Sequence, residues 1–304
     1  MNDKTKRSGG TTSTLASTGI PGLDTVMGGG LPRNHAYLIQ GRHGSGKTTL
    51  ALQFCMAGAR EGETALYLST CESESEIREV AASHGWSLEG VTLHYHDPRS
   101  SFPEGDGQSV FRPAEVELPQ TIQALLQVIQ EVDPHRLVID SLSEIRLLSP
   151  EGRWFRRQVL ALKEDLARRQ CTTFFCDDRL TPDQPVHSIV HGVIDLEQLT
   201  REYGPDRRRV RIAKLRGTSF ASGFHDFRIH TGGLEVYPRL AAAKDRPGHV
   251  PEVISTGLEE LDTLFGGGLD LGTATLMLGP SGTGKSTLAC QIAAASAQRG
   301  EAAA

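Results

Sequence analysis

Residues 41–48 have the types and spacing needed to hold the phosphates of a nucleotide. They read GRHGSGKT and fit the pattern G-x-x-x-x-G-K-[ST]. Glycines let the backbone N–H groups face inward at the positive end of a helix, where they bind phosphate oxygens. A lysine adds a charge at the β- and γ-phosphates, and a threonine hydroxyl can bind Mg²⁺. We therefore predict a site for ATP and Mg²⁺.

The residues predicted to bind the nucleotide lie in this loop and at the start of the next helix. They are Gly41, Gly44, Ser45, Gly46, Lys47, Thr48 and Thr49. Lys47 is also expected to act in catalysis, and Thr48 to bind the metal ion. A chance match to a glycine-rich turn is disfavoured because an expected strand precedes the loop and an expected helix follows it.

The same loop occurs a second time. Residues 17–63 and 255–301 align without a gap, and 24 of 47 positions are identical. Residues 279–286 read GPSGTGKS, and repetition in register makes a chance match negligible. We expect the second loop to bind nucleotide through the equivalent residues, with Ser286 at the metal ion. These residues are Gly279, Gly282, Thr283, Gly284, Lys285 and Ser286.

The repeat also predicts the domain organisation. Residues 1–16 are polar and are expected to form a disordered tail, and residues 17–248 are expected to form a complete domain. Residues 249–304 contain the first strand, phosphate loop and first helix of a second domain of the same type. So short a piece buries little apolar surface. The alternatives are a fragment of a longer chain and a remnant that leans on the first domain, and we expect the fragment.

Alternating strands and helices predict an α/β fold with a mostly parallel sheet that has helices on both faces. Residues 99–118 are expected to be a long loop. The expected strands are 36–40, 65–69, 136–140 and 172–176, with a hairpin of 193–199 and 209–215. The expected helices are 47–59, 73–84, 118–132 and 151–169.

Two carboxylates are candidates for the chemistry. Asp140 ends the apolar strand LVID and could orient Mg²⁺, although any buried strand can end in Asp. Glu72 follows the second strand at the sheet edge where ligands of α/β folds bind, and it could activate the attacking water. The alternative for Glu72 is a solvated acidic helix start with Glu74 and Glu76.

Lys214 and Arg216 are expected on one face of a strand, two residues apart. They could reach the γ-phosphate of a neighbouring subunit and neutralise charge during transfer. A solvated strand face or a nucleic-acid patch explains the same residues equally well. The net charge of −5 and the pI of about 6.1 disfavour a general nucleic-acid binder.

The remaining composition points to the cytoplasm. There is no apolar run of about 18 residues and no secretory signal at the start, so we expect no membrane span. Five cysteines, an odd number without metal-ligand spacing, fit a reducing compartment.

The chain resembles the KaiC-like branch of the RecA superfamily, double-domain ATPases that include circadian clock proteins. The resemblance rests on STGI-x-GLD-x-x-x-GGGLP, GRHGSGKT, LYLSTCESESEIREVAASHGW, LVIDSLSEI and KLRGTSFASGFHDFRI followed by GGLEVYP. These segments cover nearly all of residues 17–240.

The resemblance implies a RecA-like core, homo-hexamers with ATP between subunits, and protein signalling partners. It implies that Lys214 and Arg216 contact the nucleotide bound by the neighbouring subunit. It also implies two adjacent catalytic glutamates, for which this chain has Cys71 and Glu72. The serine/threonine autokinase positions of relatives would lie beyond residue 304.

Together these observations predict a Mg²⁺-dependent ATPase of a signalling or clock type. Two alternatives remain. One is a recombinase-type ATPase stimulated by DNA, because the same fold serves both. The other is a scaffold whose assembly is gated by nucleotide without hydrolysis, which the cysteine at position 71 favours.

Overall fold

A sheet of nine strands, ordered β11-β10-β9-β8-β3-β7-β6-β4-β5, organises the first part of the chain in the computed structural model. The strands from β8 to β5 are parallel, and β9, β10 and β11 are added antiparallel. The expected α/β fold with a mostly parallel sheet is confirmed. The strands are β3 (Ala36–Gly41), β4 (Ala65–Ser69), β5 (Val91–Tyr95), β6 (Arg136–Asp140), β7 (Thr172–Asp177), β8 (Gly192–Leu199), β9 (Arg207–Leu215), β10 (His225–His230) and β11 (Gly233–Tyr237).

The structure describes residues 14–97, 113–148, 152–178, 186–200, 202–239 and 252–301. Contacts divide the chain into the units Met1–Arg239 and Leu240–Ala304. Most of the predicted tail (1–16), residues 99–112 of the predicted loop and the predicted boundary at 248 lie outside the described residues. No helix in the described part of the chain combines the length and apolar character that a bilayer crossing requires.

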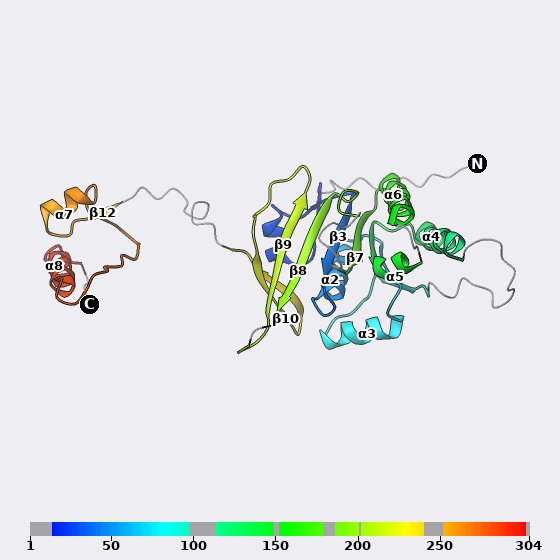
Figure 1. Ribbon diagram of the computed structural model, residues 1–304, viewed down its shortest axis with the longest axis horizontal. Helices are drawn as coiled ribbons and strands as arrows, with labels where there is room; N and C mark the ends of the chain where they lie inside the picture. Colours follow the sequence, from blue (N-terminus) through cyan, green and yellow to red (C-terminus); the bar gives the residue numbers. More distant parts are fainter. Residues whose placement is uncertain are drawn as a thin grey trace. The chain divides into compact units, whose positions relative to one another are not determined.

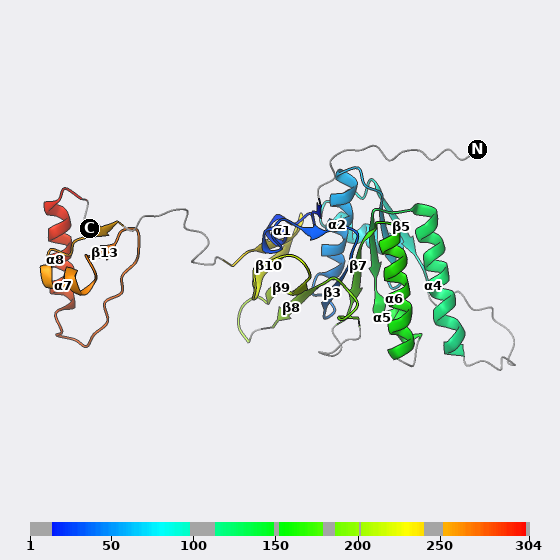
Figure 2. The ribbon, with the colours of Figure 1, turned by 90° about the horizontal axis from the view of Figure 1, so that it is seen from above.

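Helices cover both faces of the sheet. One face packs against α1 (Pro21–Val26), α2 (Lys47–Arg60) and α3 (Glu74–Ser83), and the other against α4 (Pro113–Val132), α5 (Leu142–Leu147) and α6 (Gly152–Arg168). Figures 1 and 2 show α4 and α6 side by side, across the sheet from α2. Two short strands, β1 (Leu15–Ala16) and β2 (Leu31–Pro32), precede and follow α1 in the sequence and pair antiparallel with each other.

Parallel pairing sets the place of the site. β3 is hydrogen-bonded to β7 on one side and to β8 on the other, and all six residues of β3 are buried. Parallel strands end at the same edge, so the carboxyl ends of β3, β4, β6 and β7 lie together. This edge therefore gathers Gly41, Ser69, Asp140 and Asp177 from four distant parts of the sequence.

Several predicted boundaries were wrong. α4 begins at Pro113, so residues 113–118 are helix rather than loop, and Pro119 lies inside it without ending it. β7 extends to Asp177, one residue further than expected. β9 begins at Arg207, two residues before the expected start, and ends at Leu215 as expected, so Arg216 lies just beyond the strand on which it was expected.

The second unit contains β12 (Val253–Ile254), α7 (Glu259–Leu264), β13 (Leu269–Asp270) and α8 (Lys285–Gln298). Its predicted first strand is not formed. Residues 274–279, which match β3 in the repeat, are exposed and unpaired with any described strand. In the first unit the equivalent segment, β3, pairs with β7 on one side and β8 on the other.

A buried arginine at the start of β6 connects this strand to the residues that follow α2. Arg136 is fully buried in β6 and forms ion pairs with Glu61 and Glu63, which directly follow α2. Its guanidinium donates to Ser17 O at 2.6 Å and lies 4.9 Å from the Phe54 ring centroid. Burial alone would raise the pKa of Glu63, but hydrogen bonds and charge from Arg136 and Arg33 lower it.

Replacing Arg136 should therefore destabilise the first unit strongly. We expect Arg136→Gln to reduce the free energy of unfolding by about 3–5 kcal/mol, because two carboxylates lose a buried partner. Urea denaturation measures this. Arg33→Gln is the matched control, since Arg33, whose side chain is 18% exposed against 0% for Arg136, pairs with the same glutamates, and it should cost only about 1 kcal/mol. Equal losses in the two variants would contradict this account.

Candidate functional site

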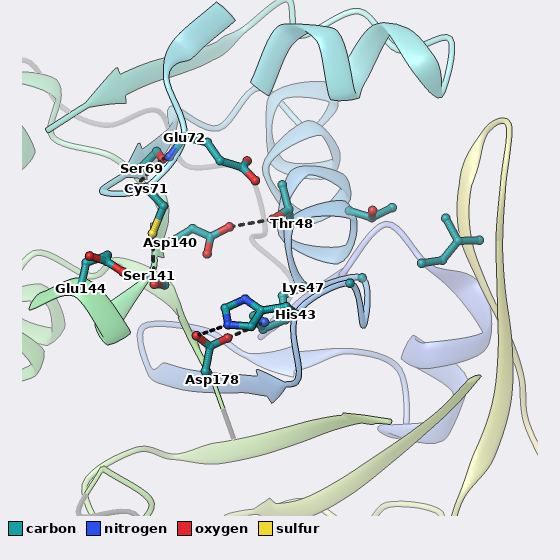
Figure 3. Close-up of a pocket in the computed structure, with 14 residues that line it drawn as sticks. His43, Lys47, Thr48, Ser69, Cys71, Glu72, Asp140, Ser141, Glu144 and Asp178 are labelled. Atoms are coloured by element: carbon teal, nitrogen blue, oxygen red, sulfur yellow. Dashed lines mark hydrogen bonds and ion pairs between the residues drawn. The ribbon is translucent and has the colours of Figure 1, made fainter. Parts of the chain in front are cut away.

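A cavity of about 430 Å³ opens at the carboxyl edge of the sheet (Figure 3). Its volume lies in the range of small-ligand sites. The residues around it come from the phosphate loop and α2, from the ends of β4, β6 and β7, from the start of α5, and from β10. They are His43, Gly44, Gly46, Lys47, Thr48, Thr49, Ser69, Cys71, Glu72, Asp140, Ser141, Glu144, Asp178 and Ile229.

The phosphate loop needs its glycines for steric reasons. Gly46 is the N-cap of α2 with φ = 100°, and a Cβ there would lie 2.7 Å from Ile229 Cδ1. A Cβ on Gly41 would lie 2.4 Å from Ser45 Oγ. The loop is therefore too tightly packed for side chains at Gly41 and Gly46. The N-terminus of α2, the helix end that attracts anions, lies at the cavity.

Lys47 lies at the base of the cavity with its side chain 10% exposed. Its Nζ donates to Gly41 O at 2.9 Å and to Arg42 O at 3.2 Å. A third hydrogen bond, also 2.9 Å, goes to Asp178 Oδ1. The ammonium is thus held by the loop that it follows and by a carboxylate from the neighbouring strand.

Thr48 and Asp140 form an oxygen pair beside it. Thr48 Oγ1 donates to Asp140 Oδ2 at 3.0 Å, and Tyr67 OH donates to the same oxygen at 2.5 Å. Burial raises the pKa of Asp140, while the hydrogen bonds from Tyr67 and Thr48 oppose that shift. A hydroxyl and a carboxylate are ligands that suit Mg²⁺, which keeps several waters and binds substrate phosphates. This donor set fits the ion.

No group of three or more His, Cys, Asp or Glu side chains in the described residues could hold a metal by itself. That result also fits Mg²⁺, because this ion is usually bound by one or two protein oxygens with the phosphates.

The turn after β4 carries Glu72 into the cavity. Ser69 Oγ accepts the backbone N–H groups of Cys71 at 3.3 Å and Glu72 at 2.9 Å. A capping box between Ser73 and Glu76 then starts α3. In Figure 3 the Glu72 carboxylate is directed toward Thr48. Burial raises the pKa of Glu72, and the charge of Asp140 raises it further.

Cys71, the predicted substitute for a glutamate, lies on the other side of this turn. Its Sγ is 3.4 Å from Ser141 Oγ, and burial raises the pKa of the thiol. The side chain therefore reaches the cavity wall as a neutral group.

Sequence reasoning missed several of the residues around the cavity. Tyr67 and Asp178 bond directly to predicted site residues, and Glu144 and Ile229 line the wall. Asp178 could have been found, because acidic residues just after an apolar strand had already singled out Asp140. Ile229 could not, since it comes from a distant strand.

Lys214 and Arg216 do not line this cavity. Lys214 Nζ donates to His187 O at 2.6 Å and to Val190 O at 2.8 Å, and Arg216 donates to Ser188 O at 3.1 Å. Both cations are thus directed at the backbone of residues 187–190.

The second phosphate loop adopts a similar turn. Lys285 Nζ donates to Gly279 O and Pro280 O, both at 2.7 Å, and Gly284 is the N-cap of α8 with φ = 84°. Its residues are mostly exposed.

The family model for the KaiC ATPase matches residues 16–241 and 254–304. The chain belongs to the KaiC ATPase family. The recognition of this family from the five sequence segments is thereby confirmed.

Individual relatives agree. The circadian clock oscillator protein KaiC of Picosynechococcus sp. is 30% identical over 93% of this chain and 55% of its own length. Circadian clock protein KaiC2 of Synechocystis sp. is 30% identical over 93% of this chain and 50% of its own. The chain thus spans about half the length of the curated relatives it matches.

A solved structure matches as well. The crystal structure of the KaiC-like protein PH0186 from the hyperthermophilic archaeon Pyrococcus horikoshii superposes with a TM-score of 0.61 and 28% identity. The match covers 74% of this chain and 99% of that one.

The Thr48–Asp140 pair predicts a specific defect. Mg²⁺ should tighten binding of a non-hydrolysable ATP analogue to the wild-type chain and have little effect on Asp140→Asn, because the variant loses the carboxylate charge beside Thr48. Titration calorimetry with and without EDTA measures this. Tyr67→Phe keeps the carboxylate and should retain most of the Mg²⁺ effect. A full effect in Asp140→Asn would contradict the assignment.

Proposed function

We propose that the chain binds Mg·ATP in the cavity of Figure 3 and hydrolyses it. The observation that carries the proposal is that Lys47, Thr48, Asp140 and Glu72 all line one cavity. Gly41–Thr48 would hold the phosphates, with Ser45 and Thr49 in the same loop and helix. Thr48 and Asp140 would hold Mg²⁺, which when bound neutralises charge on the β- and γ-phosphates.

Glu72 would act as the general base. A carboxyl with a raised pKa accepts a proton more readily at neutral pH than an ordinary glutamate, which is what activation of water requires. Lys47 would attract the charge that develops on the transferred phosphoryl group. The helix start at Ser73 fixes the turn that presents Glu72, so the base would need no large rearrangement.

Lys214 and Arg216 would complete the site of a neighbouring subunit. The support for this role is the family resemblance of the segment KLRGT, to which both residues belong. The particle would be a homo-hexamer in the cytoplasm, with protein signalling partners, as for a clock-type ATPase. The second loop, with Lys285 and Ser286, would bind a second nucleotide, and a serine/threonine autokinase activity would belong to a complete second domain.

The direct test is steady-state ATP hydrolysis by the full chain, with light scattering before and after addition of Mg·ATP. We expect Mg²⁺-dependent turnover that Lys47→Ala reduces at least about 100-fold, since the charge at the phosphates is lost. Scattering should report a hexamer. Turnover that survives Lys47→Ala would refute the proposal.

Cys71→Glu tests the catalytic turn. We expect it to raise turnover about 10-fold or more, because a second carboxylate would face the water beside Glu72. The rate of ATP hydrolysis under saturation measures this, and Cys71→Gln, similar in size and neutral, is the control. Equal rates in the glutamate and glutamine variants would show that Glu72 suffices alone.

A second candidate function is the nucleotide-gated scaffold. The neutral Cys71 at the cavity wall favours it, since a site with one carboxylate can bind nucleotide and turn it over poorly. Nucleotide-dependent assembly without turnover would support this candidate.

The arginines of β9 weigh against the DNA-stimulated alternative. Arg207, Arg209 and Arg211 form ion pairs with Asp226, Glu197 and Asp195. Arg208 donates to Gly44 O at 2.6 Å. Because three of these arginines are already paired with carboxylates of the same sheet, they offer little positive charge to the phosphates of DNA.

A further inference from the structure

Three acceptors surround the ammonium group of Lys47. They are Gly41 O, Arg42 O and Asp178 Oδ1, at 2.9, 3.2 and 2.9 Å. An ammonium has three N–H donors, so each one has an acceptor inside the protein. A phosphate that binds Lys47 must displace at least one of them.

Hydrogen bonds hold the backbone of Asp178 at the point where its carboxylate contacts Lys47. Asp178 follows β7, the strand beside β3, and its backbone N–H donates to Ser143 Oγ at 3.1 Å and to Asp177 Oδ1 at 2.9 Å. Its side chain is 14% exposed, and its second oxygen lies 3.5 Å from His43 Nε2. Both Asp178 and Lys47 line the cavity.

Such a carboxylate stabilises the site without nucleotide and destabilises the site with nucleotide. Without nucleotide it neutralises a lysine that has little access to water. With nucleotide it faces several negative phosphate charges in a site where solvent screens poorly. Both effects reduce the free energy gained when phosphates bind.

We propose that Asp178 is a positioning residue that holds Lys47 in the empty site and lowers the affinity for nucleotide, more for ATP than for ADP. The difference follows because the P-loop lysine reaches the β- and γ-phosphates, and ATP adds the γ-phosphate charge. The inference rests on the proposed nucleotide site. Its consequence is a site that releases nucleotide more easily than the loop alone would.

The test is calorimetric binding of ADP and of a non-hydrolysable ATP analogue, both with Mg²⁺, to the full chain. Asp178→Asn keeps the shape and removes the charge. We expect it to bind the ATP analogue at least about tenfold more tightly than wild type, with a smaller gain for ADP. A merely structural role would weaken binding of both.

Two variants control for charge and for general damage. Asp178→Glu keeps the charge and should not tighten binding. Asp165→Asn removes a carboxylate that pairs with Arg168 and Arg169 outside the cavity, and it should leave the binding of both nucleotides unchanged. Asp178→Ser carries the same expectation as Asp178→Asn if the asparagine variant does not fold.

The possible failures differ. A wild-type chain that binds neither nucleotide overturns the proposed function and this inference together. A wild-type chain that binds both, with Asp178→Asn equal or weaker for the ATP analogue, overturns the role of Asp178 alone.

Discussion

The hydrogen bonds that hold β3 between β7 and β8 are the constraint on which the candidate site depends. They fix Gly41 at the edge of the sheet, and the phosphate loop and α2 follow from that point. They also bring the ends of β6 and β7 beside the loop, so that Asp140 and Asp178 meet Thr48 and Lys47. The second copy of the motif illustrates the dependence. Its loop turns in a similar way, but residues 274–279 lack strand partners among the described residues, so that no described sheet continues into this loop.

The charges around the cavity explain how one lysine can serve several tasks. Lys47 is balanced by Asp178 within hydrogen-bond distance, and its charge also lowers the pKa values of Asp140 and Glu72 against the effect of burial. Bringing phosphates into this cavity changes the surroundings of all three carboxylates at once. In the proposed function, nucleotide binding, Mg²⁺ binding and activation of water would therefore be coupled through this single cation.

Patterns that act locally could be read from the sequence. The alternation of strands and helices predicted the fold. The glycine loop and the strand that ends at Asp140 predicted the residues of the cavity that would bind phosphate and metal, because each pattern depends on neighbouring residues. Parts that depend on tertiary contacts could not be read. Ile229 reaches Gly46 from a strand about 180 residues away, and Tyr67 meets Asp140 only because β4 pairs with β6. The start of α4 was missed because residues 99–118 were expected to be a long loop, whereas the helix begins at Pro113.

The central claim is that the chain hydrolyses ATP in a site completed by a second copy, and mixing two variants tests it most directly. One variant is Lys47→Ala, with its own loop disabled. The other carries Lys214→Ala and Arg216→Ala, with its contacts to the neighbour disabled. The account predicts that each is inactive alone and that an equal mixture recovers about a quarter of wild-type turnover, since random rings pair an intact loop with intact cations at that frequency. A mixture no more active than its separate components, or a Lys214→Ala, Arg216→Ala variant with full turnover, would contradict the account.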